Sequence, residues 1–222
     1  MFRGLIVLGG LLLVLGMVGC GGGDEAARTT STTEAAATST VTSGATTSTT
    51  TLVAGELEPI VVPTLPAEIP GYTEVDPATG LHMTGTPKVI DLPSYRLKVD
   101  GKVTHELSLS YDDLRRLPKM TATPTLVCQG FFTDITTWSG VPLATILEMA
   151  GVQPDAEQIT MKAADGYSAS LSLDEAVKPE NFLAYEWMGQ PLPVLHGFPL
   201  RAVIPGQNGN RWVKWLLEIV VE

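Results

Sequence analysis

The succession of short apolar segments after residue 88 restricts the fold more than any other feature of the chain. The segments are too short for typical helices, are rich in Val, Ile, Leu and Thr, and are separated by Gly, Pro or Asp-Gly. We expect strands over residues 95–99, 102–109, 120–128, 158–163, 167–171, 182–187, 200–204 and 213–222. There is no internal repeat and no alternation of strands with long helices. The pattern therefore predicts an α+β domain made mainly of mixed, barrel-like sheet with short helices.

Three short helices are expected between these strands. Ser110 and Asp113 have the spacing of a capping box at the start of the first helix. The second helix is expected over residues 143–150, with Gly151 as its end signal. The third is expected over residues 172–177, because Ser172 is suited to an N-cap.

The composition fits one globular domain with attached segments. The chain has 222 residues, of which 44% are hydrophobic and 17% charged. Pro59, Pro63, Pro66 and Pro70 predict an extended rather than helical beginning of the domain. We therefore place the domain at residues 59–222.

The first residues are typical of an export signal. Met1–Arg3 is a short basic start, and Leu5–Val18 is apolar but too short for an ordinary membrane span. Small residues precede Cys20 at the end of this apolar stretch, as in bacterial lipoprotein signals. We expect residues 1–19 to be a signal peptide and Cys20 to be lipidated. An uncleaved N-terminal anchor is the alternative.

Residues 20–58 have the composition of a tether. They are dominated by Thr, Ser, Ala and Gly, which cannot form a packed core. We expect this segment to be disordered and to connect the lipid to the domain. The domain is then expected at the cell membrane, lipid-anchored, on the extracytoplasmic face.

The charge of the chain bears on its partners. The formal net charge is −10, which argues against nucleic acid as a partner. In a chain with this net negative charge, three basic residues close together in the C-terminal part, Arg201, Arg211 and Lys214, suggest an anion-binding site.

Cys128 is the only cysteine in the expected domain, at the end of the apolar run over residues 120–128. Such a thiol in an exported protein is a buried small hydrophobe, a metal ligand or a reactive group. Thiolates favour soft or borderline transition metals. Far downstream, residues 196–215 hold Arg and Lys among Gly and Pro, and guanidinium, ammonium and backbone N–H groups suit phosphate. The sequence thus indicates a metal ligand and an anion site.

Four motifs strengthen this interpretation by their order: Arg96–Gly101, Cys128 followed by Trp138–Leu143, Ala164–Tyr167, and His196–Trp215. Together they resemble the sulfite oxidase-type molybdopterin-binding domain. Bacterial periplasmic oxidoreductases, such as the catalytic subunit of the methionine sulfoxide reductase system, are members of this family. The resemblance begins near residue 86 and continues to the end of the chain.

The resemblance implies a molybdenum–molybdopterin cofactor. Molybdenum would be held by the dithiolene of one pyranopterin, with Cys128 supplying a further sulfur. The residues implied to bind the pterin and its phosphate are His196, Arg201, Arg211, Trp212, Val213 and Lys214. Ordinary alternatives stay open: a turn histidine at His196, a surface ion pair at Arg201, and solvated cations at Arg211 and Lys214.

The chain departs from the family pattern near the expected metal ligand. No Arg or Lys occurs between Lys119 and Lys162, so an oxyanion such as sulfite is not the expected substrate. Phe131 and Phe132 follow Cys128 instead, and they suit a thioether, a sulfoxide or another neutral oxide.

Two further departures concern the cofactor. Met188 stands where relatives have Asn, which removes a hydrogen-bonding side chain from that turn. The leader carries Arg3 alone and no twin-arginine pair. Because molybdopterin is inserted in the cytoplasm, this leader leaves open whether the exported protein carries the cofactor.

The resemblance implies an enzyme, a molybdopterin-dependent oxidoreductase that transfers an oxygen atom to or from a small-molecule substrate. No haem-binding Cys-x-x-Cys-His motif is present, so electrons are expected from a separate protein partner. The chain ends directly after this domain, and a monomer is expected. Tyr167 and Asp134 are candidates for acid–base roles by position alone. His82 and His105 receive no role, because they lack the spacing of metal ligands.

A different class of function stays open. A cofactor-free binding module would keep the fold and use its cavity for another ligand, with Cys128 as a structural or redox-sensing thiol. An envelope structural protein is a third interpretation. The retained thiol and cations favour the enzyme, whereas the single leader arginine and Met188 favour the binding module.

Overall fold

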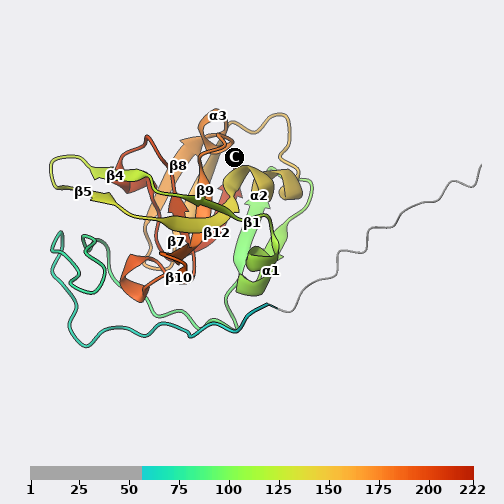
Figure 1. Cartoon of the computed structure of the whole chain (residues 1–222). Coiled ribbons are helices and arrows are strands. Elements are labelled where there is room, and N and C mark those ends of the chain that lie inside the picture. The colour runs from blue at the N-terminus through green and yellow to red at the C-terminus, as the bar shows by residue number, and fades with distance from the viewer. Residues whose placement is uncertain (1–56) are drawn as a thin grey trace, which may run out of the picture. The chain divides into compact units, whose positions relative to one another are not determined.

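The computed structural model describes residues 57–222 (Figure 1), so the predicted signal peptide, Cys20 and most of the tether lie outside the described residues. A first sheet has the strand order β2 (Leu107–Leu109), β1 (Leu97–Gly101), β12 (Leu216–Val221), β7 (Gln158–Ala163) and β8 (Ser168–Ser172). β1 and β12 are parallel and the other neighbours are antiparallel. This sheet is therefore mixed, as the sequence predicts.

The second sheet is antiparallel throughout. Its order is β10 (Gln190–Pro191), β9 (Phe182–Trp187), β6 (Trp138–Pro142) and β3 (Met120–Ala122), with β11 (Arg201–Val203) also paired to β9. The expectation of a mainly β domain with short helices is confirmed. Within residues 57–222 both sheets are open, and no closed barrel forms.

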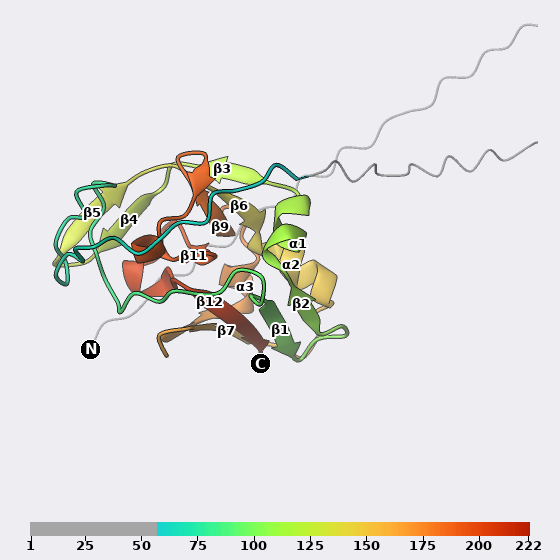
Figure 2. The same cartoon turned by 90° about the horizontal axis from the view of Figure 1, so that it is seen from below.

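A hairpin of β4 (Thr125–Cys128) and β5 (Phe132–Ile135) projects from the body of the domain (Figures 1 and 2). The sequence predicted one strand over residues 120–128, and this prediction is wrong at Pro124. Proline has no N–H to donate to a strand ladder, so the strand is interrupted there. Because of the interruption, Cys128 lies in the hairpin and not in the second sheet.

The helices begin and end close to the predicted positions. They are α1 (Tyr111–Arg116), α2 (Leu143–Ala150) and α3 (Leu173–Ala176), with two short 3₁₀ helices, η1 (Val194–His196) and η2 (Gly209–Arg211). Ser110 and Asp113 form the predicted capping box, and the Ser172 hydroxyl caps α3. Gly151 ends α2 with a φ of 66°, a left-handed conformation that glycine adopts without strain.

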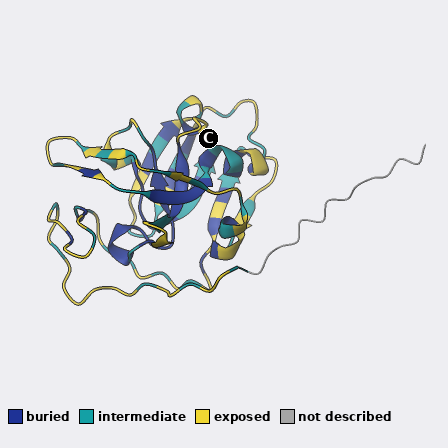
Figure 3. Ribbon diagram, in the orientation of Figure 1, coloured by how far each residue is buried: buried dark blue, intermediate teal, exposed yellow. Residues whose placement is uncertain are grey.

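Burial is concentrated in the centre of the domain, where both five-stranded sheets lie (Figure 3). The largest fully buried side chains include Trp138, Phe182 and Phe198. Residues 57–94, here called the strap, contain no helix or multi-residue strand and run along the outside of the domain (Figures 1 and 2). Along residues 57–222 no helix combines the length and the apolar character that a membrane crossing needs.

Candidate functional site

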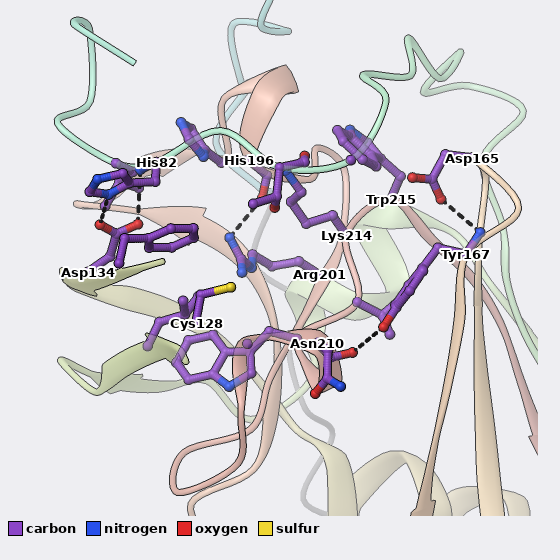
Figure 4. Close-up of a pocket in the computed structure, with 18 of the residues that line it drawn as sticks. His82, Cys128, Asp134, Asp165, Tyr167, His196, Arg201, Asn210, Lys214 and Trp215 are labelled. Carbon is purple, nitrogen blue, oxygen red and sulfur yellow. Dashed lines mark hydrogen bonds and ion pairs between the residues drawn. The ribbon is translucent and has the colours of Figure 1, made fainter. Parts of the chain in front are cut away.

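A cavity of about 340 Å³ lies where the strap, the β4–β5 hairpin and residues 194–215, here called the C-terminal segment, meet (Figure 4). It is lined by Tyr72, Leu81, His82, Thr84 and Gly85 of the strap, by Leu126, Cys128, Phe132 and Asp134 of the hairpin, by Trp138, Asp165 and Tyr167, and by His196, Arg201, Gly209, Asn210, Trp212, Val213, Lys214 and Trp215. Such a volume suits a small organic ligand or cofactor. All of the predicted metal- and cofactor-binding residues except Arg211 line this one cavity.

Cys128 is the last residue of β4 and lies partly buried at the cavity. Its sulfur points toward the guanidinium of Arg201 (Figure 4). Burial, and then the negative charge of Asp134, raise the pKa of the thiol. A raised pKa disfavours a reactive free thiolate, whereas a metal ion at the sulfur would deprotonate the thiol outright.

Arg201 begins β11, and its side chain is buried between two indole rings. The guanidinium carbon lies 4.4 Å from the ring centre of Trp138 and 5.8 Å from that of Trp212. One terminal nitrogen donates to the carbonyl oxygen of His196 at 3.2 Å. Burial lowers the pKa of Arg201 to about 9, which indicates that its charge has little compensation from the protein.

Lys214 lies beside Arg201 on the same wall. Its ammonium donates to the carbonyl oxygens of Leu195, at 2.9 Å, and Thr84, and it lies 4.5 Å from the ring centre of Trp215. Burial, and then the positive charge of Arg201, lower the pKa of Lys214 well below its usual value. Gly197 makes this crowding possible, because a Cβ there would lie 3.0 Å from Cβ of Arg201 and 3.2 Å from Cβ of Lys214.

Within residues 57–222, these two buried cations lack a carboxylate at ion-pair distance. Across residues 57–222, neither Arg201 nor Lys214 forms an ion pair with a carboxylate. Nε of Arg201 and Nε1 of Trp212 are buried without a hydrogen-bond partner in that same range. Unpaired buried N–H groups and uncompensated charges are costly unless something binds them. The wall therefore fits an anionic group that carries several hydrogen-bond acceptors.

His196 connects the C-terminal segment to the strap. Its Nε2 lies 2.9 Å from Oδ2 of Asp76 and 2.9 Å from the hydroxyl of Thr79. Burial is the main cause that lowers the pKa of His196 to about 4, with Lys214 and Arg201 acting in the same direction. The ring is therefore neutral at pH 7, and the role of Asp76 and Thr79 in holding it had no signal in the sequence.

Two residues that the sequence linked to the site lie elsewhere. Arg211 does not line the cavity, because its guanidinium donates to the carbonyl of Ser170 on β8. Its predicted role as a cofactor-binding residue stays a prediction. Met188 lies in the exposed turn between β9 and β10 with a φ of 50°. Asn tolerates that left-handed conformation better than Met, so this position concerns the turn and not the cavity.

His82 and Asp134 form a pair across the cavity from the cations (Figure 4). Nδ1 of His82 lies 2.6 Å from Oδ1 of Asp134, and the backbone N–H of His82 donates to Oδ2 at 3.0 Å. The His82 ring stacks on Phe132, with ring centres 4.3 Å apart and planes 6° apart. In the sequence, position alone makes Asp134 a candidate for an acid–base role, and no role is expected for His82.

Tyr167 stands at the rim of the cavity. Its hydroxyl donates to the carbonyl of Asn210 at 2.7 Å, and its backbone N–H donates to Asp165 at 3.0 Å (Figure 4). Burial raises the pKa of the phenol, so it is protonated at pH 7. The acid–base role that position alone suggested for Tyr167 stays a prediction.

Comparisons with known proteins agree with one family. The family model described as an oxidoreductase molybdopterin binding domain matches residues 83–222. The uncharacterized oxidoreductase YuiH of Bacillus subtilis is 34% identical over 137 residues, which cover 61% of this chain and 69% of that protein. A candidate protein-methionine-sulfoxide reductase subunit of Azospira oryzae, YedZ1, is 32% identical over 132 residues, or 60% of this chain and 50% of that protein.

Other proteins show the same relationship. Mitochondrial sulfite oxidase of Rattus norvegicus is 37% identical over 163 residues, which cover 60% of this chain and 30% of that protein. The crystal structure of the sulfane dehydrogenase SoxCD from Paracoccus pantotrophus matches with a TM-score of 0.57 and 27% identity, over 64% of this chain and 41% of that chain. The match thus spans 69% of YuiH, about half of YedZ1 and less than half of the sulfite oxidase and of SoxCD.

The family match explains the chemistry of the cavity. It covers more than half of the chain, from Met83 in the strap to the end of β12. A pterin phosphate is the kind of anion that the uncompensated cations require, and molybdenum–molybdopterin is the cofactor of this family. The chain belongs to the oxidoreductase molybdopterin-binding domain family.

Proposed function

We propose that this protein is a molybdopterin-dependent oxidoreductase that transfers an oxygen atom to or from a small neutral sulfur compound outside the cytoplasm. One observation carries the proposal: the sulfur of Cys128 lies at the same cavity as two buried cations that have no carboxylate partner within residues 57–222. A soft ligand and an anion site at one cavity are what a metal–pterin cofactor needs.

The roles of the residues follow from their positions. Sγ of Cys128 would bind molybdenum, and the cations of Arg201 and Lys214 would bind the phosphate and the polar edge of the pterin. Trp212 would donate its buried Nε1–H, and His196 would hold the strap against the pterin side of the cavity. When bound, the cofactor supplies the two-electron redox chemistry, while the protein positions it and excludes water.

The lining of the cavity supports a neutral substrate. Leu126, Phe132 and Trp138 make this part of the cavity apolar, and the hairpin contributes no cation. The relatives are named for sulfite, sulfane and methionine sulfoxide. Of these three classes, a sulfoxide or thioether fits an apolar wall better than an oxyanion.

The partners and the location are part of the same proposal. We propose that electrons pass to or from a separate protein. One relative is itself named as a subunit, which supports a partner. The apolar leader and Cys20 support a lipid-anchored protein on the extracytoplasmic face of the cell membrane. We propose a monomeric catalytic chain.

Metal and pterin analysis tests this function. Protein expressed with a cytoplasmic supply of the cofactor should contain about one molybdenum per chain and release a fluorescent oxidised pterin. Cys128→Ala should abolish sulfoxide reduction with a viologen electron donor and leave the melting temperature of the protein almost unchanged. Cys20→Ser, which removes the other cysteine, is the matched control and should keep both metal and activity.

A well-folded protein without molybdenum or pterin, from a host that loads another molybdoenzyme, would contradict the proposal. It would favour the cofactor-free binding module, with Cys128 as a structural thiol. The raised pKa of Cys128 already argues against a redox-sensing thiolate in that alternative.

A further inference from the structure

The His82–Asp134 pair is a cluster at the cavity to which the cofactor-binding roles assign nothing. Asp134 lies on the hairpin and His82 on the strap beside it, whereas Arg201 and Lys214 lie on the C-terminal segment. The negative charge of Asp134 acts on the Cys128 thiol and on the Arg201 guanidinium, which places the pair near the expected position of the metal. The pair is therefore on the substrate side of the cavity.

The orientation of the His82 ring is fixed on three sides. Both oxygens of Asp134 accept hydrogen bonds from His82, one from the ring and one from the backbone. An acceptor at Nδ1 places the ring proton there. Phe132 covers one face of the ring. A ring held in this way has one nitrogen left for chemistry, Nε2.

Nε2 of His82 is accessible to a ligand of the cavity. It has no hydrogen-bond partner in the part of the chain that the structure describes, and the side chain is 25% exposed while it lines the cavity. A pair that only fastened the strap to the hairpin would need no ring at the cavity surface. A histidine oriented by a carboxylate, with its second nitrogen directed to a site, is the usual arrangement of a general acid–base.

Reduction of a sulfoxide requires such a group. The S–O bond breaks, the sulfur gains an electron pair, and the oxygen leaves as water after it takes up two protons. The two electrons come from the electron-transfer partner through the cofactor. The protons must reach an oxygen that is enclosed by apolar side chains such as Leu81, Leu126 and Phe132. The cations on the opposite wall are bound to backbone carbonyls and face the anion site.

We propose that the imidazolium form of His82, oriented by Asp134, donates a hydrogen bond and then a proton from Nε2 to the oxygen of a neutral sulfoxide in this cavity, while solvent supplies the second proton. The transfer leaves a neutral ring that keeps its remaining proton on Nδ1. The inference rests on the proposed function and adds to it a catalytic residue and a substrate class. In the reverse direction, oxidation of a thioether with water, the same nitrogen accepts the proton.

Two substitutions separate proton transfer from fastening of the strap. His82→Asn keeps an amide N–H near the Nδ1 position and can still bind Asp134, but it has no Nε2. Its kcat with methyl phenyl sulfoxide should fall about 100-fold, with molybdenum content and melting temperature unchanged. His82→Gln keeps a hydrogen-bond donor near the Nε2 position, although this amide does not titrate. The decrease in kcat should therefore be smaller than in His82→Asn. His105→Asn, the same change at an exposed histidine, should have wild-type kinetics.

A second measurement does not depend on turnover. In nitrogen NMR of the three imidazole rings, the neutral His82 ring should carry its proton on Nδ1. Methyl phenyl sulfoxide should favour protonation of Nε2 of His82 and so shift its signal, but it should not shift the ring nitrogens of His105. Wild-type kcat in His82→Asn, with molybdenum present, would overturn the inference and leave the proposed function standing. A wild-type protein without molybdenum and without activity would contradict the proposed function. An Nε2 signal of His82 that does not shift when methyl phenyl sulfoxide is added would contradict the inference alone.

Discussion

The C-terminal segment and the β4–β5 hairpin form opposite walls of one cavity and are built in different ways. On the C-terminal segment, His196, Arg201 and Lys214 are buried together with Trp212 and Val213. On the hairpin, Asp134 is buried, whereas Val127, Phe131 and Ile135 are exposed, and Figure 3 shows the same contrast along the ribbon. One wall is part of the packed core, and the other is a two-stranded arm.

This difference assigns the walls to different ligands. Burial strengthens electrostatic interactions, so a buried wall with two uncompensated cations is suited to hold a charged cofactor permanently. An exposed arm has fewer packing constraints and can exchange a small substrate. Substitutions on the C-terminal segment should therefore change cofactor retention and the stability of the fold. Substitutions on the hairpin wall should change the kinetics of substrate turnover.

The largest expected effect tests the buried wall through pH. His196 has a folded-state pKa of about 4 against an ordinary value of 6.5, so between these values the unfolded chain binds a proton that the folded chain does not. Stability should fall as the pH drops from 6.5 to 4, by about 3 kcal/mol in total, and level off below. Urea unfolding of the cofactor-free protein at a series of pH values measures this.

The variant His196→Gln keeps a donor for Asp76 but does not titrate, and it should lose most of that slope between pH 6.5 and 4. The pKa of Asp76 is lowered from its ordinary value of 3.8, so this group changes the stability only below that pH, outside the range from 6.5 to 4. His105→Gln removes an exposed imidazole and should leave the slope in place. An unchanged slope in His196→Gln would contradict the description of this wall as buried.

The next effect concerns the charge of the same wall. Arg201→Met keeps a long apolar side chain between Trp138 and Trp212 but removes the cation. A charge-assisted hydrogen bond contributes about 1.5–3 kcal/mol, so the cofactor should dissociate about 10- to 100-fold more readily. Because the cation has no carboxylate partner among residues 57–222, the cofactor-free variant should be at least as stable as the wild type.

Pterin release after gel filtration and thermal unfolding of the cofactor-free protein measure the two parts of this prediction. Arg116→Met is the matched control, since Arg116 forms only an exposed pair with Asp113 at 3.8 Å. Normal pterin retention together with a lower melting temperature in Arg201→Met would show that Arg201 stabilises the fold and does not bind the cofactor.

The two walls also differ in how far the sequence predicts them. Local signals predicted the capping box at Ser110, the end of α2 at Gly151 and most strands, because each depends on neighbours in the chain. The order of the motifs pointed to Cys128 and to the C-terminal segment. The prediction of one strand through Pro124 was wrong because the apolar pattern continues across this residue, whereas proline has no N–H for the hydrogen-bond ladder.

The missed residues depend on tertiary contacts. Asp76 and His82 belong to the strap, which has no regular pattern, and they meet His196 and Asp134 only through folding. For Arg211, the motif predicts its place in the C-terminal segment, but the sequence does not predict that its side chain donates to Ser170 on β8. Position along the chain predicts which segment reaches a site, and not which way each side chain faces.

The smallest expected effect lies at the rim between the walls. Tyr167→Phe removes the hydrogen bond from the phenol to the carbonyl of Asn210, on a side chain that is 44% exposed. A partly solvated neutral hydrogen bond contributes about 1 kcal/mol or less, so cofactor retention and kcat should each change less than about fivefold. Tyr72→Phe, at a cavity-lining tyrosine whose hydroxyl has no bond within residues 57–222, should change neither. A 100-fold loss of kcat in Tyr167→Phe would instead identify the phenol at the rim as the proton donor. It would contradict the assignment of the hairpin wall to the substrate.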